Sequence, residues 1–134
     1  KFNDEDKKIL DNYKTNLKII RNKIDDNDIN FYINFIVNSL FAANKYFNDQ
    51  EPWKKKGDEI RLNTIVYTTL EIIRKISFLM YPIIPDTSLK ALKIFDLKEN
   101  EINLSSIEKH ENLKAGSKIN SIDILFKKID KLDD

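Results

Sequence analysis

Apolar residues recur every three or four positions along three long stretches of this chain, which is the spacing of one face of an α-helix. The first stretch, Asp4–Lys23, repeats through Ile9, Leu17 and Ile20. Asp4 is expected to cap this helix, because a short acidic side chain satisfies free N–H groups at a helix start. The polar run 25–28 then favours a turn.

The second stretch, Ile29–Phe47, predicts another amphipathic helix. Pro52 disfavours helical geometry at Glu51, so the helix is expected to end before that point. Seven residues of the stretch share one face and predict its buried side: Ile29, Ile33, Ile36, Val37, Leu40, Phe41 and Asn44.

The third stretch, Asp58–Tyr81, is apolar nearly all round, which is typical of a central helix in a bundle. Its expected buried residues are Ile65, Leu70, Ile73, Ile76 and Leu79. Its charged residues are expected on a less buried side: Arg61, Glu71, Arg74 and Lys75. Pro82 and Pro85 end this helix, and a short fourth helix capped by Asp86 or Thr87 follows.

Beyond residue 96 the pattern weakens. It predicts a short helix within residues 99–113, a turn at Gly116, and an extended segment 122–126 that packs back on the helices. Long helices with short connections favour antiparallel neighbours. The sequence therefore predicts an all-α fold, an antiparallel helical bundle with a short packed C-terminal tail, forming one domain over residues 1–134.

Composition removes several classes of function. The 23 basic and 22 acidic residues give a net charge of +1, so any contact with RNA must come from a local patch. The chain has no cysteine and one histidine, His110, so we expect no metal site. Gly57 and Gly116 are too far apart for a phosphate loop, and no catalytic set stands out. No apolar run reaches the roughly 18 residues of a membrane span, and we expect no signal peptide.

One short segment carries candidate chemistry. Trp53, the only tryptophan, follows Pro52 and precedes Lys54, Lys55 and Lys56. An indole ring can stack on an unpaired base, neighbouring lysines can meet phosphates, and proline can hold the ring ready. The other interpretation is a helical protein-interaction module, in which Trp53 is a buried or partner-binding anchor and the lysines are simply solvated.

Several short motifs, taken in their order along the chain, help to choose between RNA binding and protein interaction. An Asn-x-Tyr near the end of the second predicted helix is followed by Pro-Trp, then by a helix with Val-Tyr, Leu-Glu and Arg, then by Pro-x-x-Pro-x-Thr. Their members are Asn44, Tyr46, Pro52, Trp53, Val66, Tyr67, Leu70, Glu71, Arg74, Pro82, Pro85 and Thr87. Over about residues 42–129 this order resembles the anticodon-binding domain of methionyl-tRNA synthetases, which are class I aminoacyl-tRNA synthetases.

The resemblance has two departures. The family carries Pro-Leu-Phe-Pro near its end, whereas residues 124–127 lack both prolines. The family also has a preceding helix with an Asn and an Arg that read anticodon bases, and this chain is expected to begin after that helix. The synthetases for isoleucine, valine, leucine and cysteine share the helical bundle, but the Asn-x-Tyr and Pro-Trp spacing fits the methionine family.

The resemblance implies a recognition role. Trp53 would stack on a base of the tRNA-Met anticodon, Pro52 would shape its loop, and polar neighbours would help hold the anticodon: Asn44, Lys54, Lys55 and Lys56. The chain would be a non-catalytic fragment of a cytoplasmic methionine–tRNA ligase. ATP and magnesium would bind in the catalytic domain of the same parent chain, whose signature motifs are absent here, so we expect no catalytic residue and no cofactor in this part.

Overall fold

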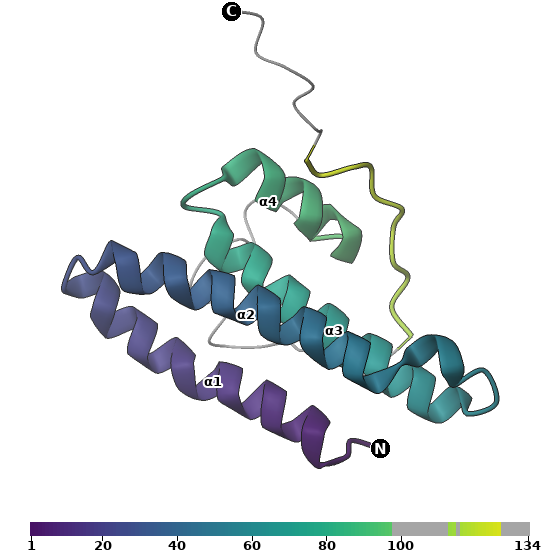
Figure 1. Cartoon of the computed structure of the whole chain (residues 1–134). Coiled ribbons are helices and arrows are strands. Elements are labelled where there is room, and N and C mark those ends of the chain that lie inside the picture. Colours follow the sequence, from purple (N-terminus) through teal and green to yellow (C-terminus); the bar gives the residue numbers. More distant parts are fainter. Residues whose placement is uncertain (98–112, 115, 127–134) are drawn as a thin grey trace, which may run out of the picture.

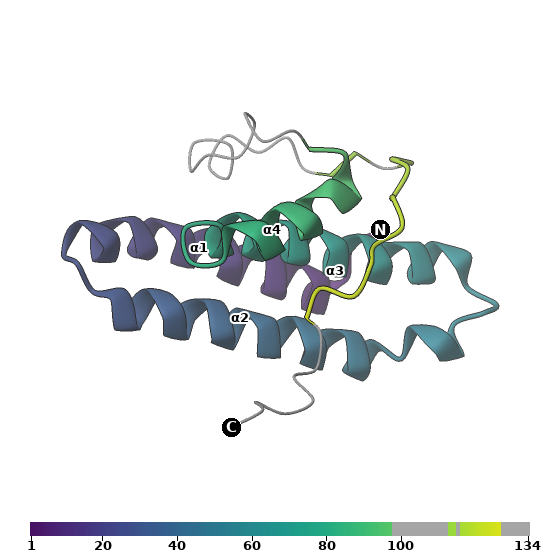
Figure 2. The ribbon, with the colours of Figure 1, turned by 90° about the horizontal axis from the view of Figure 1, so that it is seen from above.

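The structure is a computed structural model that describes residues 1–97, 113–114 and 116–126. Within them the regular secondary structure is helical, which confirms the predicted all-α class. Three long helices, α1 (Asp4–Asp25), α2 (Ile29–Gln50) and α3 (Glu59–Met80), run antiparallel to their neighbours in sequence (Figure 1). The short α4 (Pro85–Leu92) packs on α3, and α2 packs against both α1 and α3 (Figure 2). Two short 3₁₀ turns, η1 (Pro52–Lys54) and η2 (Lys93–Phe95), complete the described elements.

The cap of α1 differs from the predicted one. Asn3, not Asp4, is the N-cap residue, and its side chain accepts the backbone N–H of Asp6 at 2.9 Å. The Asp6 carboxylate in turn accepts the N–H of Asn3 at 2.9 Å, so the two residues form a capping box. This reciprocal pair satisfies two N–H groups, which a cap at Asp4 alone would not do.

The cap of α4 also differs from the prediction. Pro85 occupies the first turn, and Ile84 is the N-cap residue without a side-chain hydrogen bond. Asp86 and Thr87 therefore lie inside the helix. Proline suits the first position of a helix because the N–H that it lacks would have no partner there.

The buried face of α2 is not the one predicted. Its buried residues are Tyr32, Ile36, Ala43 and Tyr46, and only Ile36 belongs to the expected set. Both tyrosine hydroxyls find buried acceptors: Tyr32 donates to the Leu79 carbonyl and Tyr46 to Asp6. Because these partners lie on other helices, the sequence of α2 alone favours the aliphatic face instead. That aliphatic face is exposed in the described structure: Ile29, Ile33, Val37, Leu40 and Phe41.

The core of α3 is partly as predicted. Ile65, Ile76 and Leu79 are almost completely buried. Leu70 and Ile73, in contrast, are half-buried and line a groove between α2 and α3.

The expected less buried side of α3 is wrong for three of its four charged residues. Glu71, Arg74 and Lys75 expose 5% of their surface or less. The Glu71 carboxylate accepts bonds from Arg74 Nε at 3.0 Å and Nη2 at 2.8 Å, and Lys75 Nζ lies 3.5 Å from it. Charges can be buried when they are paired in this way.

The C-terminal tail is attached mainly through polar groups. Asn120 donates its backbone N–H to the Ile94 carbonyl and its side-chain amide to the Lys93 carbonyl, both at 3.0 Å. Ile122, Ile124 and Phe126 remain exposed, so the tail contributes few buried apolar side chains. The helix expected within residues 99–113 lies outside the described residues apart from Leu113, and so does His110.

Candidate nucleic-acid interface

The connection between α2 and α3 is an ordered series of turns. Glu51 adopts a left-handed conformation (φ 45°) directly after α2, and Pro52 then starts η1. Backbone N–H groups bond back to carbonyls three residues earlier: Lys54 to Glu51 at 2.9 Å, Lys55 to Pro52 at 3.0 Å, and Asp58 to Lys55 at 2.9 Å. These bonds give the connection a definite backbone conformation.

The Trp53 side chain lies at the surface on this framework. Its exposed fraction is 52%, whereas the preceding Pro52 is buried and anchors the turn. The indole ring contacts Phe47 of α2, with ring centroids 6.2 Å apart and planes inclined by 59°. The exposure contradicts the interpretation of Trp53 as a buried anchor, because about half of the side chain is open to solvent.

Asn44 lies one helical turn before Phe47 and is exposed. Both residues line the groove between α2 and α3, whose volume is about 520 Å³. The remaining lining is almost entirely apolar: Leu40, Ala43, Val66, Thr69, Leu70 and Ile73. Phe47 thus joins Trp53 to the groove, and the Asn44 amide places a donor and an acceptor beside it.

The three lysines of the turn differ from one another. Lys54 Nζ lies 2.6 Å from Glu51 Oε1, and both side chains are largely exposed. Such a pair contributes little stability, so the ammonium group can exchange its partner. Lys55 is half-buried and Lys56 is exposed, and neither makes an ion pair with another described residue. The turn therefore presents positive charge beside the indole ring.

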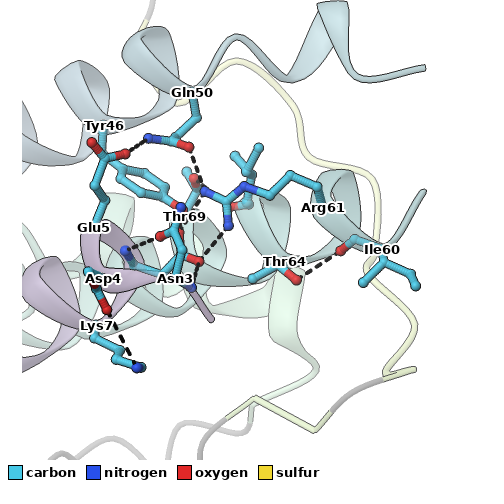
Figure 3. A network of polar contacts seen from close by, with 12 residues as sticks. Asn3, Asp4, Glu5, Lys7, Tyr46, Gln50, Ile60, Arg61, Thr64 and Thr69 are labelled. Carbon is cyan, nitrogen blue, oxygen red and sulfur yellow. Dashed lines mark hydrogen bonds and ion pairs between the residues drawn. The ribbon is translucent and has the colours of Figure 1, made fainter. Parts of the chain in front are cut away.

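A buried polar network lies behind this turn, and the sequence analysis did not predict it. The Asp6 carboxylate, which has no exposed surface, accepts bonds from Arg61 Nη1 at 2.5 Å and Nη2 at 2.9 Å. It also accepts the hydroxyl of Tyr46. Arg61 donates in addition to the Gln50 side chain, whose amide nitrogen donates to Glu5 (Figure 3).

The network keeps Asp6 ionised. Burial alone would raise the pKa of its carboxyl group, but hydrogen bonds from Arg61, Tyr46 and Asn3 hold the pKa below its ordinary value of 3.8. Burial of the Tyr46 hydroxyl and its hydrogen bond to Asp6 raise the pKa of this hydroxyl to about 12. The site thus combines the buried ion pair of Asp6 and Arg61 with the solvent-exposed ring of Trp53.

A family model described as the anticodon binding domain of methionyl tRNA ligase matches residues 1–134. The chain belongs to this family. Curated relatives agree with this assignment. Methionine–tRNA ligase of Brucella suis biovar 1 is 35% identical over 94 residues, which are 69% of this chain and 18% of the relative. The enzyme of Thermotoga maritima is 38% identical over 93 residues, which are 68% of this chain and 15% of the relative. The chain thus spans less than a fifth of these relatives.

Solved structures of the same family share the fold of this anticodon-binding domain. The apo form of Mycobacterium tuberculosis methionyl-tRNA synthetase is 25% identical, with a TM-score of 0.86, covering 95% of this chain and 26% of that one. A complex of the same enzyme with methionyl-adenylate gives a TM-score of 0.87. The arrangement of helices that places Trp53 is therefore that of the family.

The structure brings most of the predicted site residues of the anticodon-binding domain to one end of α2. Asn44 and Phe47 line one groove, Trp53 contacts Phe47, and Pro52 and the lysines lie on the adjoining turn. Sequence reasoning missed Phe47, Asp6 and Arg61. Asp6 lies 40 positions from Tyr46 and 55 positions from Arg61, so these contacts give no local signal in the sequence. No group of His, Cys, Asp or Glu in the described ranges could hold a metal ion, and no described helix is long and apolar enough to cross a membrane.

Proposed function

We propose that this domain holds the anticodon loop of tRNA-Met within a methionine–tRNA ligase, the enzyme that attaches methionine to its tRNA. Recognition is its whole contribution: a separate catalytic domain of the same parent chain binds ATP and magnesium and carries out the reaction, in the cytoplasm. The observation that carries the proposal is the half-exposed ring of Trp53 on a turn that is already ordered.

Base stacking is the interaction this ring suits best. Proteins that read single-stranded RNA loops stack unpaired bases on aromatic side chains, and each such contact contributes about 1–3 kcal/mol. One part of the indole rests against Phe47, so its orientation is restricted before any base arrives. Because the buried Pro52 also fixes the backbone, little conformational entropy remains to be lost on binding.

The polar neighbours of Trp53 contribute two other kinds of contact, to base edges and to phosphates. The Asn44 amide can form hydrogen bonds with a base edge that enters the groove beside Phe47. Lys55 and Lys56 contribute charge for the phosphates, and Lys54 does so by leaving Glu51. Phosphate contacts position the loop, whereas the stacked base and the amide supply selectivity.

The decisive experiment replaces Trp53 in the full-length enzyme. Trp53→Ala should lower kcat/KM for tRNA aminoacylation by roughly 5- to 150-fold, which is the loss of one stacking contact. Methionine-dependent pyrophosphate exchange should stay unchanged, because it requires no tRNA. Trp53→Phe, which keeps a smaller ring, should retain part of the activity. Equal charging by Trp53→Ala and the parent would refute the proposal and leave Trp53 as an anchor for a protein partner.

Lysine variants test the electrostatic part separately. Lys56→Ala should weaken tRNA binding and reduce its dependence on salt concentration by about one phosphate contact. Lys90→Ala is the matched control, because Lys90 is also exposed but lies on α4. If both variants change the salt dependence equally, the effect reflects overall charge rather than the turn.

A further inference from the structure

The two ends of the connection that carries Trp53 meet at a single residue. Gln50 is the last residue of α2, and its side-chain oxygen accepts a bond from Arg61 Nη2. Asp58 caps α3, and its carboxylate accepts the backbone N–H of Arg61 at 2.9 Å. The chain leaves the bundle after Gln50 and re-enters it at Asp58, so Arg61 closes the connection at its base.

Arg61 is in turn held from the first turn of α1. Asp6 engages both terminal nitrogens of the guanidinium group, at 2.5 and 2.9 Å, although the two residues are 55 positions apart. Asp6 is completely buried, and the capping box with Asn3 and the hydroxyl of Tyr46 fix its carboxylate. A buried bidentate pair of this kind restricts its members far more than an exposed ion pair does.

We propose that Asp6 and Arg61 are positioning residues for Trp53: their pair orders the α2–α3 connection, and with it the indole ring, only when the first turn of α1 is docked. This inference rests on the proposed function for its link to tRNA. Neither side chain needs to touch RNA. Arg61 is 17% exposed at its side chain and Asp6 not at all, so both act through Gln50 and Asp58 on the turn between them.

The geometry explains why this pair, and not the turn alone, sets the position of the ring. The hydrogen bonds inside the turn join residues only three apart, so they shape it locally without fixing it to the helices. The contact of Phe47 with Trp53 restricts the orientation of the ring, but it relates the ring to α2 alone and not to α1 or α3. Among the described residues, the Arg61 bonds to Gln50 and Asp58 are the side-chain contacts that relate the start of the turn to its end.

The test uses four variants of the full-length enzyme. Asp6→Asn removes the charge of the carboxylate with little change of shape. Arg61→Lys replaces the guanidinium group with one ammonium group, which cannot form the bidentate pair with Asp6 and also bond to Gln50. Gln50→Ala removes the bond to the turn while leaving the buried Asp6–Arg61 pair in place. The control is Glu71→Gln, which disturbs another buried ion network, in the middle of α3.

Two measurements separate positioning from general stability. Fluorine NMR of protein labelled with 5-fluorotryptophan reports on Trp53 directly, through the resonance that Trp53→Phe removes. Steady-state aminoacylation gives KM for tRNA and kcat separately. We expect a shifted or broadened Trp53 resonance and a KM raised about tenfold in Asp6→Asn, Arg61→Lys and Gln50→Ala, within the range of one weakened stacking contact. kcat and pyrophosphate exchange should not change.

Three outcomes have distinct meanings. An unchanged resonance and KM in folded Arg61→Lys and Gln50→Ala would overturn the inference. An equal rise of KM in Glu71→Gln would also overturn it, because the effect would then follow stability alone. If the resonance moves while Trp53→Ala leaves KM unchanged, positioning of the ring stands and the proposed function fails.

Discussion

Glu71 of α3 accepts a hydrogen bond at 3.1 Å from the backbone N–H of Leu113, which lies 42 positions further along the chain. The same carboxylate pairs with Arg74 and Lys75, so two cations and one amide share one buried group. The tail is therefore joined to the middle of α3 through the Glu71 carboxylate. Because this carboxylate is buried, water cannot take the place of its bonding partners.

Glu71→Gln should cost about 3–5 kcal/mol of unfolding free energy, because it removes the charge of the buried carboxylate that pairs with Arg74 and Lys75. Urea unfolding followed by circular dichroism measures the loss. Asp49→Asn is the control: it breaks the exposed Lys45–Asp49 pair and should cost less than about 1 kcal/mol. Similar losses in both variants would show that the buried network contributes no more than a surface pair.

The same carboxylate predicts a dependence of stability on pH. Burial raises the pKa of Glu71, but Arg74, the N–H of Leu113 and Lys75 together hold the pKa below its ordinary value of 4.5. The unfolded chain then binds the proton more readily than the folded one, so acid favours unfolding. The contribution of Glu71 to the free energy of unfolding should be complete above pH 4.5, and it should disappear as the pH falls through the lowered pKa of the folded protein.

This sign can be checked by comparing the parent with Glu71→Gln at neutral pH and in steps below 4.5. The difference in unfolding free energy between the two proteins should shrink as the pH falls. A difference that stays constant would mean that Glu71 titrates alike in the folded and unfolded chains.

Two isoleucines one turn apart on α3 test the revised core. Ile76 is 1% exposed, and Ile76→Ala should destabilise the fold by about 2–5 kcal/mol, through lost burial and a cavity. Ile73 is half-buried in the groove, so Ile73→Ala should cost less, about 1–2 kcal/mol. Thermal or urea unfolding ranks the two, and a larger loss for Ile73→Ala would contradict the assignment of the buried face.

The helices could be predicted because their signals are local. Periodic apolar residues, the polar run 25–28 and the three prolines place α1, α2 and α3 to within a few residues of the observed bounds. The faces were harder to predict. On α2 two apolar faces compete, and hydroxyl partners on other helices decide for Tyr32 and Tyr46. On α3 the charged side chains predict an exposed side, whereas mutual pairing lets Glu71, Arg74 and Lys75 lie inside.

The candidate site divides in the same way. Pro52 and Trp53 are adjacent in sequence, and the motif that contains them is compact enough to recognise. Asp6 resembles any acidic residue in a first helical turn, where the helix dipole favours it. Its pairing with Arg61 appears only in the folded chain, where the starts of α1 and α3 lie at the same end of the bundle (Figure 1).

The Asp6 carboxylate belongs both to the capping box of α1 and to the pair with Arg61 that holds the α2–α3 connection. The start of α1 and the ordered conformation of this connection are therefore thermodynamically linked. Such linkage is reciprocal in free energy: the docked first turn favours the ordered connection, and anything that selects the ordered connection favours the docked first turn to the same extent. Fraying, which ordinarily makes the first turn of a helix its least stable part, is thereby opposed by residues far away in the sequence. The first helical turn becomes part of a cooperative unit with a surface loop more than forty residues away.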